Sequence, residues 1–159
     1  MKKILRKKEA RIPFTKEGFE QIVAEQKKLL AERPDAVEHL RKSREMGDLS
    51  ENGYYKASRQ RLTFLDGRIR RVERLVKLAI IVESSNTGVV DIGSTVTIKN
   101  DEQTFTYTIV GGYESDPTKK TISHISPLGK ALMGKKVHDT AIMNAPAGIK
   151  TFTIVSISS

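Results

Sequence analysis

Apolar residues follow two helical periodicities in the first half of the chain. In the second of these, apolar and small residues recur at alternating intervals of three and four, which is the a/d pattern of a coiled-coil seam. Its positions are Tyr55, Ser58, Leu62, Leu65, Ile69, Val72, Val76 and Ala79. A looser seam precedes it, at Phe19, Ile22, Val23, Leu29, Leu30, Ala36, Val37 and Leu40. Two seams joined by a short polar turn predict an antiparallel helical hairpin.

The ends of the two helices carry recognisable signals. Thr15 stands before Lys16 and Glu17, which predicts that it caps the first helix. Pro34 falls within the first seam, so we expect either a kink or a restarted helix there. The second helix is predicted to run roughly from Asn52 to Val82. At 1.5 Å per residue it would be about 45 Å long and would project beyond a compact domain.

The pattern changes near residues 84–88, where heptads give way to short β-branched runs. Strands are expected at 93–99, 104–110, 121–125, 137–144 and 151–157, with a short helix at 127–133 that Ser126 and Pro127 begin. We therefore predict an α+β protein. Residues 1–83 form the hairpin with a basic arm, 84–91 a linker, and 92–159 a small, mostly antiparallel sheet with one helix packed on it.

Composition excludes several classes of protein. The chain has no Cys, which excludes disulfides and thiolate metal sites. No apolar run is long enough to cross a bilayer, and the basic residues 1–8 lead into no hydrophobic signal segment. A cytoplasmic protein without membrane attachment is expected, and no feature of the sequence requires more than a monomer.

The net charge of +9 is concentrated on the predicted hairpin. Between residues 56 and 77, eight basic residues face only Asp66 and Glu73. Five of the eight fall within an arc of roughly 60° on a helical wheel, namely Lys56, Arg59, Arg70, Arg74 and Lys77. We call these five residues the basic stripe. It is suited to a phosphate backbone of RNA or DNA, although a solvated helix face would look similar.

The predicted turn, residues 46–53, places two carboxylates at the tip of the hairpin. Asp48 and Glu51 are oxygen ligands of the kind that Mg²⁺ prefers, but two ligands are too few to hold the ion in free solution. A metal role therefore requires a partner that supplies the rest of the site. The spacing of the two residues also fits a capping box, with Asp48 as the N-cap of the second helix. Both interpretations stay open on the residues alone.

The second half contains no recognisable catalytic apparatus. His39, His124 and His138 are far apart in the sequence and show no metal-ligand spacing. The sequence has no glycine-rich phosphate loop and no nucleophile elbow. We expect a docking module.

Two motifs resemble those of the Gre transcript cleavage factors (GreA/GreB) of bacterial RNA polymerase. The first is Gly-Asp-Leu-Ser-Glu-Asn at 47–52, followed by Tyr55. The second is the serine-proline region, residues 122–135, followed by Asn-Ala-Pro-Ala-Gly at 144–148. The two motifs occur in the family's order, and the resemblance covers residues 12–158.

The resemblance implies a hairpin that enters the polymerase's secondary channel while a second domain, similar to FK506-binding proteins, docks at the channel rim through Ser126 and Pro127. Asp48 and Glu51 would then help to hold a Mg²⁺ shared with the polymerase active site, with Asn52 and Tyr55 supporting the tip. The basic stripe would contact the nascent RNA near its 3′ end. By this resemblance the chain activates hydrolysis by the polymerase and is no enzyme alone, because the two-metal chemistry is completed by two proteins.

Three residues depart from the family's pattern. Gly53 stands where Ala is usual, Tyr54 where a further acid is common, and Ile125 where a polar residue often contributes to docking. Branch signals are mixed, because residues 59–62 and 68–71 are closer to GreB whereas Leu49 and residues 128–130 are closer to GreA. A regulator that occupies the channel without stimulating cleavage is the main alternative. A prolyl isomerase is disfavoured by the few aromatic residues of the second module, which are Phe105, Tyr107, Tyr113 and Phe152.

Overall fold

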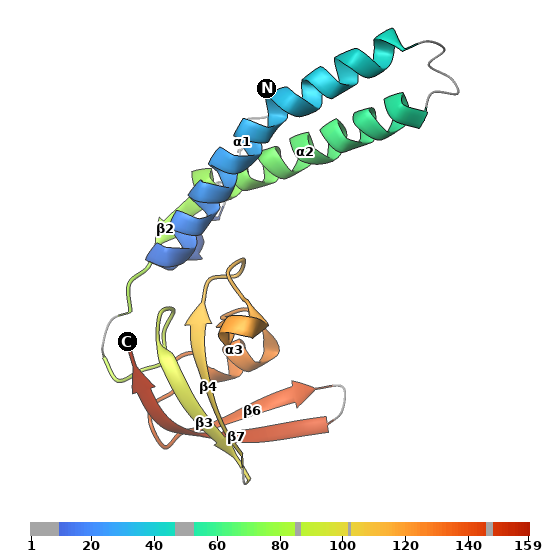
Figure 1. Cartoon of the computed structure of the whole chain (residues 1–159). Helices are drawn as coiled ribbons and strands as arrows, with labels where there is room; N and C mark the ends of the chain where they lie inside the picture. The colour runs from blue at the N-terminus through green and yellow to red at the C-terminus, as the bar shows by residue number, and fades with distance from the viewer. Residues whose placement is uncertain (1–9, 47–52, 85–86, 102, 146–147) are drawn as a thin grey trace, which may run out of the picture. The chain divides into compact units, whose positions relative to one another are not determined.

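The computed structural model describes residues 10–46, 53–84, 87–101, 103–145 and 148–159. Its contacts divide the chain into two compact units. One comprises residues 20–78, and the other combines residues 1–19 with 79–159. The division at 83 and the linker at 84–91 stay predictions. The architecture is α+β, with two long helices and a curled, mainly antiparallel sheet, as expected (Figure 1).

The helical hairpin consists of α1 (Lys16–Glu45) and α2 (Gly53–Leu78). Thr15 caps α1 as predicted, because its Oγ1 accepts a hydrogen bond from the Gly18 N–H at 3.0 Å. α1 is one helix through Pro34, so a restart at that residue is wrong. Proline cannot donate to the Leu30 carbonyl. Because Pro34 and Leu30 are both exposed, water can satisfy that carbonyl instead.

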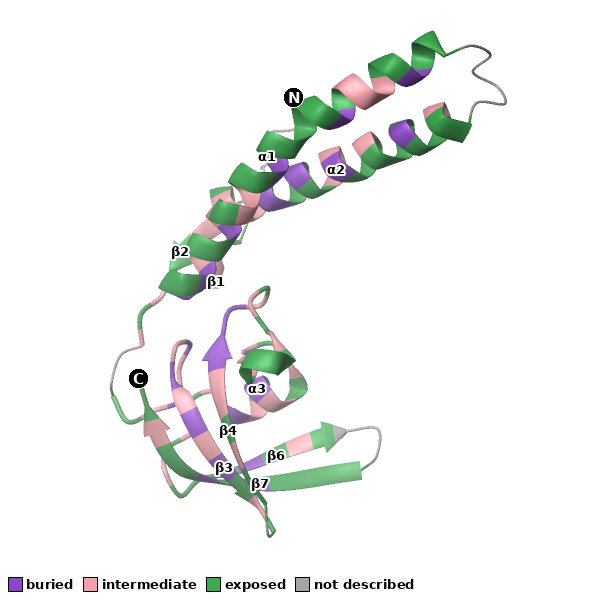
Figure 2. Cartoon of the chain, in the orientation of Figure 1, coloured by how far each residue is buried: buried purple, intermediate pink, exposed green. Residues whose placement is uncertain are grey.

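The core of the hairpin follows most of the predicted second seam. Its buried side chains are Leu29, Ala36, Leu65, Ile69 and Val72, with Leu62 and Val76 partly buried beside them. Figure 2 shows the buried positions along the facing sides of the two helices. Leu30 and Val37 were wrongly assigned to the first seam, since 45% and 41% of their surfaces are exposed. From Ile22 onward the buried positions of α1 recur every seven residues. Leu30 and Val37 each follow a buried residue by about 100° around the helix.

α2 is shorter than predicted. It ends at Leu78, and Ala79–Ile81 form β2, which pairs in parallel with β1 (Ile12–Phe14). Ala79 therefore lies in a strand and not in the helical seam. Ala-Ile-Ile has no helix-stop signal before it, but its β-branched residues suit a strand once β1 offers a partner.

The sheet has the strand order β5-β4-β3-β7-β6. β3 (Thr95–Asn100) and β4 (Gln103–Val110) form the first predicted hairpin, and β6 (Thr140–Ala145) and β7 (Gly148–Ser158) form the closing one. β5 (Thr121–Ser123) pairs in parallel with β4. A short 3-10 helix, η1 (Pro117–Lys119), precedes β5 and was not predicted.

One short helix, α3 (Pro127–Leu132), packs with the sheet, as predicted. The shared core is formed by Val90, Val96, Ile98, Ile109, Leu132, Ala141, Phe152 and Ile154. Inward residues of β3 alternate with partly exposed ones, which is the period of a sheet that buries one face. α3 contributes Leu132 to this core, and the side chain of Leu132 is fully buried.

Candidate functional site

The described part of the hairpin ends on either side of the predicted tip. Asp48, Glu51 and Asn52 lie outside the described residues, so their roles as metal ligands, cap or support stay predictions. On the flanks, Met46 is 71% exposed and Tyr54 is 40% exposed, whereas Tyr55 is half-buried. The tip motif is therefore bracketed by the last turn of α1 and the first turn of α2.

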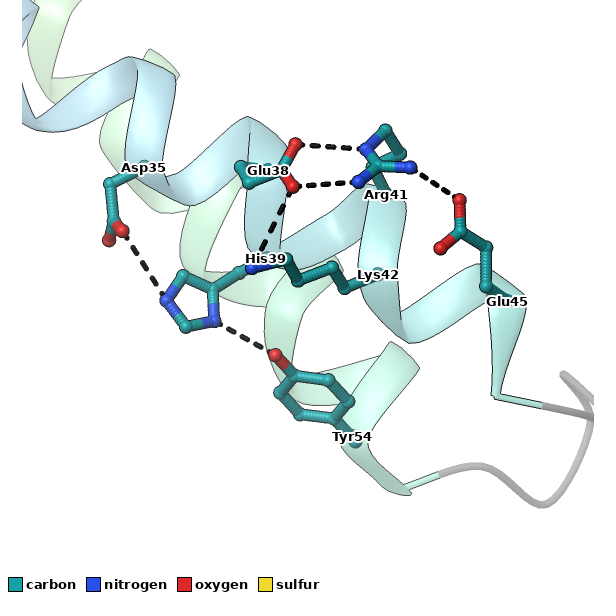
Figure 3. Close-up of polar contacts among 7 residues, drawn as sticks. All are labelled: Asp35, Glu38, His39, Arg41, Lys42, Glu45 and Tyr54. Carbon is teal, nitrogen blue, oxygen red and sulfur yellow. Dashed lines mark hydrogen bonds and ion pairs between the residues drawn. The ribbon is translucent and has the colours of Figure 1, made fainter.

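Tyr54 is held by α1 through His39 (Figure 3). The Tyr54 hydroxyl lies 2.8 Å from His39 Nδ1, and His39 Nε2 lies 3.4 Å from an oxygen of Asp35. The two rings meet edge to face, with centroids 6.4 Å apart. One ring nitrogen of His39 is thus hydrogen-bonded to Tyr54, and the other lies beside the Asp35 carboxylate.

This contact joins residues that lie 15 positions apart in the sequence, on different helices. Neither the departure at Tyr54 nor the isolated position of His39 in the sequence predicts it. The i, i+4 spacing of Asp35 and His39 was a usable signal, because it places both side chains on one face of a helix. The contact between α1 and α2 depends on their register, which only the packed hairpin determines.

The last turns of α1 carry a row of paired charges (Figure 3). Arg41 donates to Glu38 at 2.8 and 2.9 Å and to Glu45 at 2.5 Å, and Lys42 lies 3.8 Å from Glu38. Hydrogen bonding from Arg41 lowers the pKa of Glu38 from 4.5 to about 2. The carboxylates of Glu38 and Glu45 are thus engaged by basic side chains next to the tip.

All five residues of the basic stripe lie on α2 and are exposed. Two further basic residues of α2 pair with α1: Arg61 lies 3.1 Å from Asp35, and Arg68 pairs with Glu25. Asp66 faces Arg33 across the hairpin at 2.8 Å, and that hydrogen bond lowers the pKa of Asp66. Arg61 and Arg68 therefore tie the two helices together, and the five side chains of the stripe are exposed on α2.

The predicted docking residues start α3. Ser126 Oγ accepts a hydrogen bond from the Gly129 N–H at 3.0 Å, and Pro127 occupies the first helical position. Pro127 is exposed, and Ile125 just before it is 55% exposed. The turn therefore presents an apolar pair at the surface, held in place by the cap.

A groove of about 310 Å³ lies over the sheet, near α3. It is lined by Asn100, Gln103, Phe105, Tyr107, Leu128, Met143, Lys150 and Phe152. Phe105, Tyr107 and Phe152, three of the four aromatic residues named from the sequence, thus share one surface. The rings of Phe105 and Tyr107 are stacked, with their centroids 6.2 Å apart.

No group of three His, Asp or Glu side chains suited to a metal occurs in the described ranges. None of the helices within those ranges is long and apolar enough to span a membrane.

Two family profiles match the chain in the order of its halves. The profile described as "Transcription elongation factor, N-terminal" matches residues 12–81, and "Transcription elongation factor, GreA/GreB, C-term" matches residues 84–159.

Curated relatives match over nearly the whole length. The transcription elongation factor GreA of Rickettsia prowazekii is 40% identical over 152 residues, covering 92% of this chain and 94% of that protein. GreA of Thermomicrobium roseum is 38% identical over 151 residues, covering 92% and 97%. A crystal structure of GreA factor homolog 1 of Thermus thermophilus is 25% identical, covers 94% of this chain and 99% of that one, and has a TM-score of 0.45.

Proposed function

Because the chain belongs to the GreA/GreB family of transcription elongation factors, we propose that it stimulates RNA cleavage by bacterial RNA polymerase in backtracked complexes. The hairpin enters the secondary channel and brings Asp48 and Glu51 to the polymerase active centre. The observation that carries this proposal is the exposed basic stripe on α2, directly behind a tip whose motif contains both carboxylates. The cations of the stripe would meet the anionic RNA, and the two carboxylates would meet the catalytic metal ion.

Asp48 and Glu51 contribute oxygen ligands and no complete metal site. Their donor set fits Mg²⁺, which takes one or two carboxylates in addition to water and phosphate oxygens. The ion would be shared with the polymerase, whose own residues supply the remaining ligands. The chain then acts as an activator of the hydrolysis and has no independent nuclease activity.

The stripe contributes a path for the extruded RNA. Lys56 and Arg59 lie in the first two turns of α2, and Arg70, Arg74 and Lys77 continue along it. Phosphates of a single strand would lie along these cations, with release of counterions. This contact would hold the RNA 3′ segment beside the hairpin while the scissile phosphate is at the tip.

The second unit supplies docking on the polymerase surface. Ile125 and Pro127 form the exposed apolar pair at the start of α3, where a polar side chain is common in the family. Docking would therefore depend on packing around Pro127 more than on a polar contact. The factor acts as a monomer in the cytoplasm, where the polymerase is found.

A transcript cleavage assay tests the proposal. A stalled, backtracked bacterial elongation complex receives the wild-type chain or the Asp48→Asn/Glu51→Gln variant, with Mg²⁺ present. Shortened RNA with the wild type alone, and polymerase binding retained by both, is the expected result. These substitutions keep the side-chain shape, and a polar oxygen remains for capping. Binding without shortened RNA in either reaction would refute cleavage stimulation and favour a factor that only occupies the channel.

A further inference from the structure

Phe64 is the most exposed aromatic side chain of the described hairpin, with 70% of its surface accessible. It lies on α2 next to the buried Leu65, but it points away from the seam. Its ring is not part of the hairpin core that the described residues form. An exposed ring of this size in the middle of a helix is available for contact with another molecule.

The surroundings of Phe64 are basic. Its ring borders an open groove of about 430 Å³ on the outer face of α2, lined by Lys56, Arg59, Gln60, Thr63 and Phe64. Lys56, Gln60 and Phe64 are spaced by four residues, so they follow one ridge of the helix. Among the described residues, no carboxylate lines the groove and none pairs with Lys56 or Arg59.

A flat apolar ring beside two cations is complementary to a nucleotide of a single strand. The ring offers a face on which any base can stack, and the cations offer contacts to the adjacent phosphates. Gln60 adds an amide that can donate to or accept from a base edge or a ribose hydroxyl. To match this groove, a protein partner would need an anionic group beside an apolar one. Every nucleotide carries both, as its phosphate and its base.

We propose that Phe64 is a stacking platform for a base of single-stranded RNA whose neighbouring phosphates lie on Lys56 and Arg59. The inference rests on the proposed function for the RNA that reaches α2, and it adds a base contact to a surface otherwise assigned to phosphates. Stacking tolerates any base, so the platform would hold extruded RNA without regard to its sequence.

Binding of a labelled oligonucleotide tests the platform without the polymerase. Fluorescence anisotropy compares a 12-nucleotide adenine RNA with a ribose-phosphate strand of the same length that lacks bases. We expect the wild-type chain to bind the base-containing strand about 5- to 10-fold more tightly at the same salt concentration. Phe64→Leu should lose most of this preference while binding the abasic strand as before, and Phe64→Tyr should retain it.

Tyr113→Leu is the matched control, because Tyr113 is an aromatic residue with 52% exposure in the other unit. It should leave the preference unchanged. A wild-type chain that binds both strands equally, or a Phe64→Leu variant that keeps the full preference, would overturn the proposal. Weaker polymerase binding by Phe64→Leu with the preference intact would instead make the ring a protein contact.

The two proposals can fail separately. Absence of cleavage by the wild type, together with an intact base preference, would refute cleavage stimulation and leave the platform standing. Cleavage that depends on Asp48 and Glu51, together with no base preference, would refute the platform alone.

Discussion

The hydroxyl of Tyr54 lies 2.8 Å from Nδ1 of His39 and joins the first turn of α2 to α1, next to the tip of the hairpin. Asp35 supports the imidazole from one turn earlier in α1, at 3.4 Å. Tyr54 thus takes part in the contact between the two helices. It links the first turn of α2 to α1.

Tyr54→Phe should loosen the first turn of α2 without unfolding the hairpin. The variant keeps the ring and loses one exposed hydrogen bond, worth about 0.5 kcal/mol. Amide hydrogen exchange at residues 54–57 should become about two- to threefold faster. Tyr107→Phe, which changes the same group in the other unit, should leave this exchange unaltered. Unchanged exchange in Tyr54→Phe would mean that the contact with His39 does not stabilise the turn.

Leu65→Ala should destabilise the hairpin by about 2–3 kcal/mol, because it opens a cavity in a seam where Leu65 is only 7% exposed. Thermal unfolding followed by circular dichroism at 222 nm measures the loss. Leu30→Ala removes the same atoms from a side chain that is 45% exposed, and it should cost less than about 1 kcal/mol. Similar losses in the two variants would contradict the observed register of the seam.

Acid should weaken α1 through Glu38. Its pKa is lowered from 4.5 to about 2 by Arg41, so the folded state binds a proton less readily than the unfolded state. The stabilisation is present above pH 4.5 and is lost as the pH falls toward 2. Between these values, the melting temperature of the wild type should fall more steeply than that of Glu38→Gln. Glu32→Gln, an exposed substitution on the same helix, should retain the wild-type steepness, and a Glu38→Gln profile parallel to the wild type would refute the assignment.

Neutralising Arg70 and Arg74 should reduce the salt dependence of RNA binding. Each phosphate contact to a single strand contributes about 0.7 to the slope of log affinity against log salt concentration. The magnitude of this slope should therefore be smaller by up to about 1.4 in the Arg70→Gln/Arg74→Gln variant. The same titration on Arg61→Gln provides the control, because Arg61 pairs with Asp35 across the hairpin. A double variant with the wild-type slope would exclude the basic stripe as the RNA path.

The sequence by itself determined the α+β class and the order of the two long helices, of the five strands of the main sheet and of α3. The three-four spacing in α2 predicted its buried positions from Ser58 to Val72, and turn residues predicted both β-hairpins. The cap at Thr15 and the start of α3 at Ser126 followed from local chemistry that needs only neighbouring residues. Clustered positive charge on one face of α2 was also visible from periodicity alone.

The tertiary structure decided what depends on residues far apart in the chain. Ala79 joins a strand because β1 offers it a partner, and Leu30 and Val37 are exposed because the register of the hairpin excludes them from the seam. The same register pairs His39 with Tyr54, and it leaves Phe64 on the outer face of α2 beside Lys56 and Arg59. Periodicity specifies the face on which a side chain lies, but only packing determines which faces meet and which stay open to a partner.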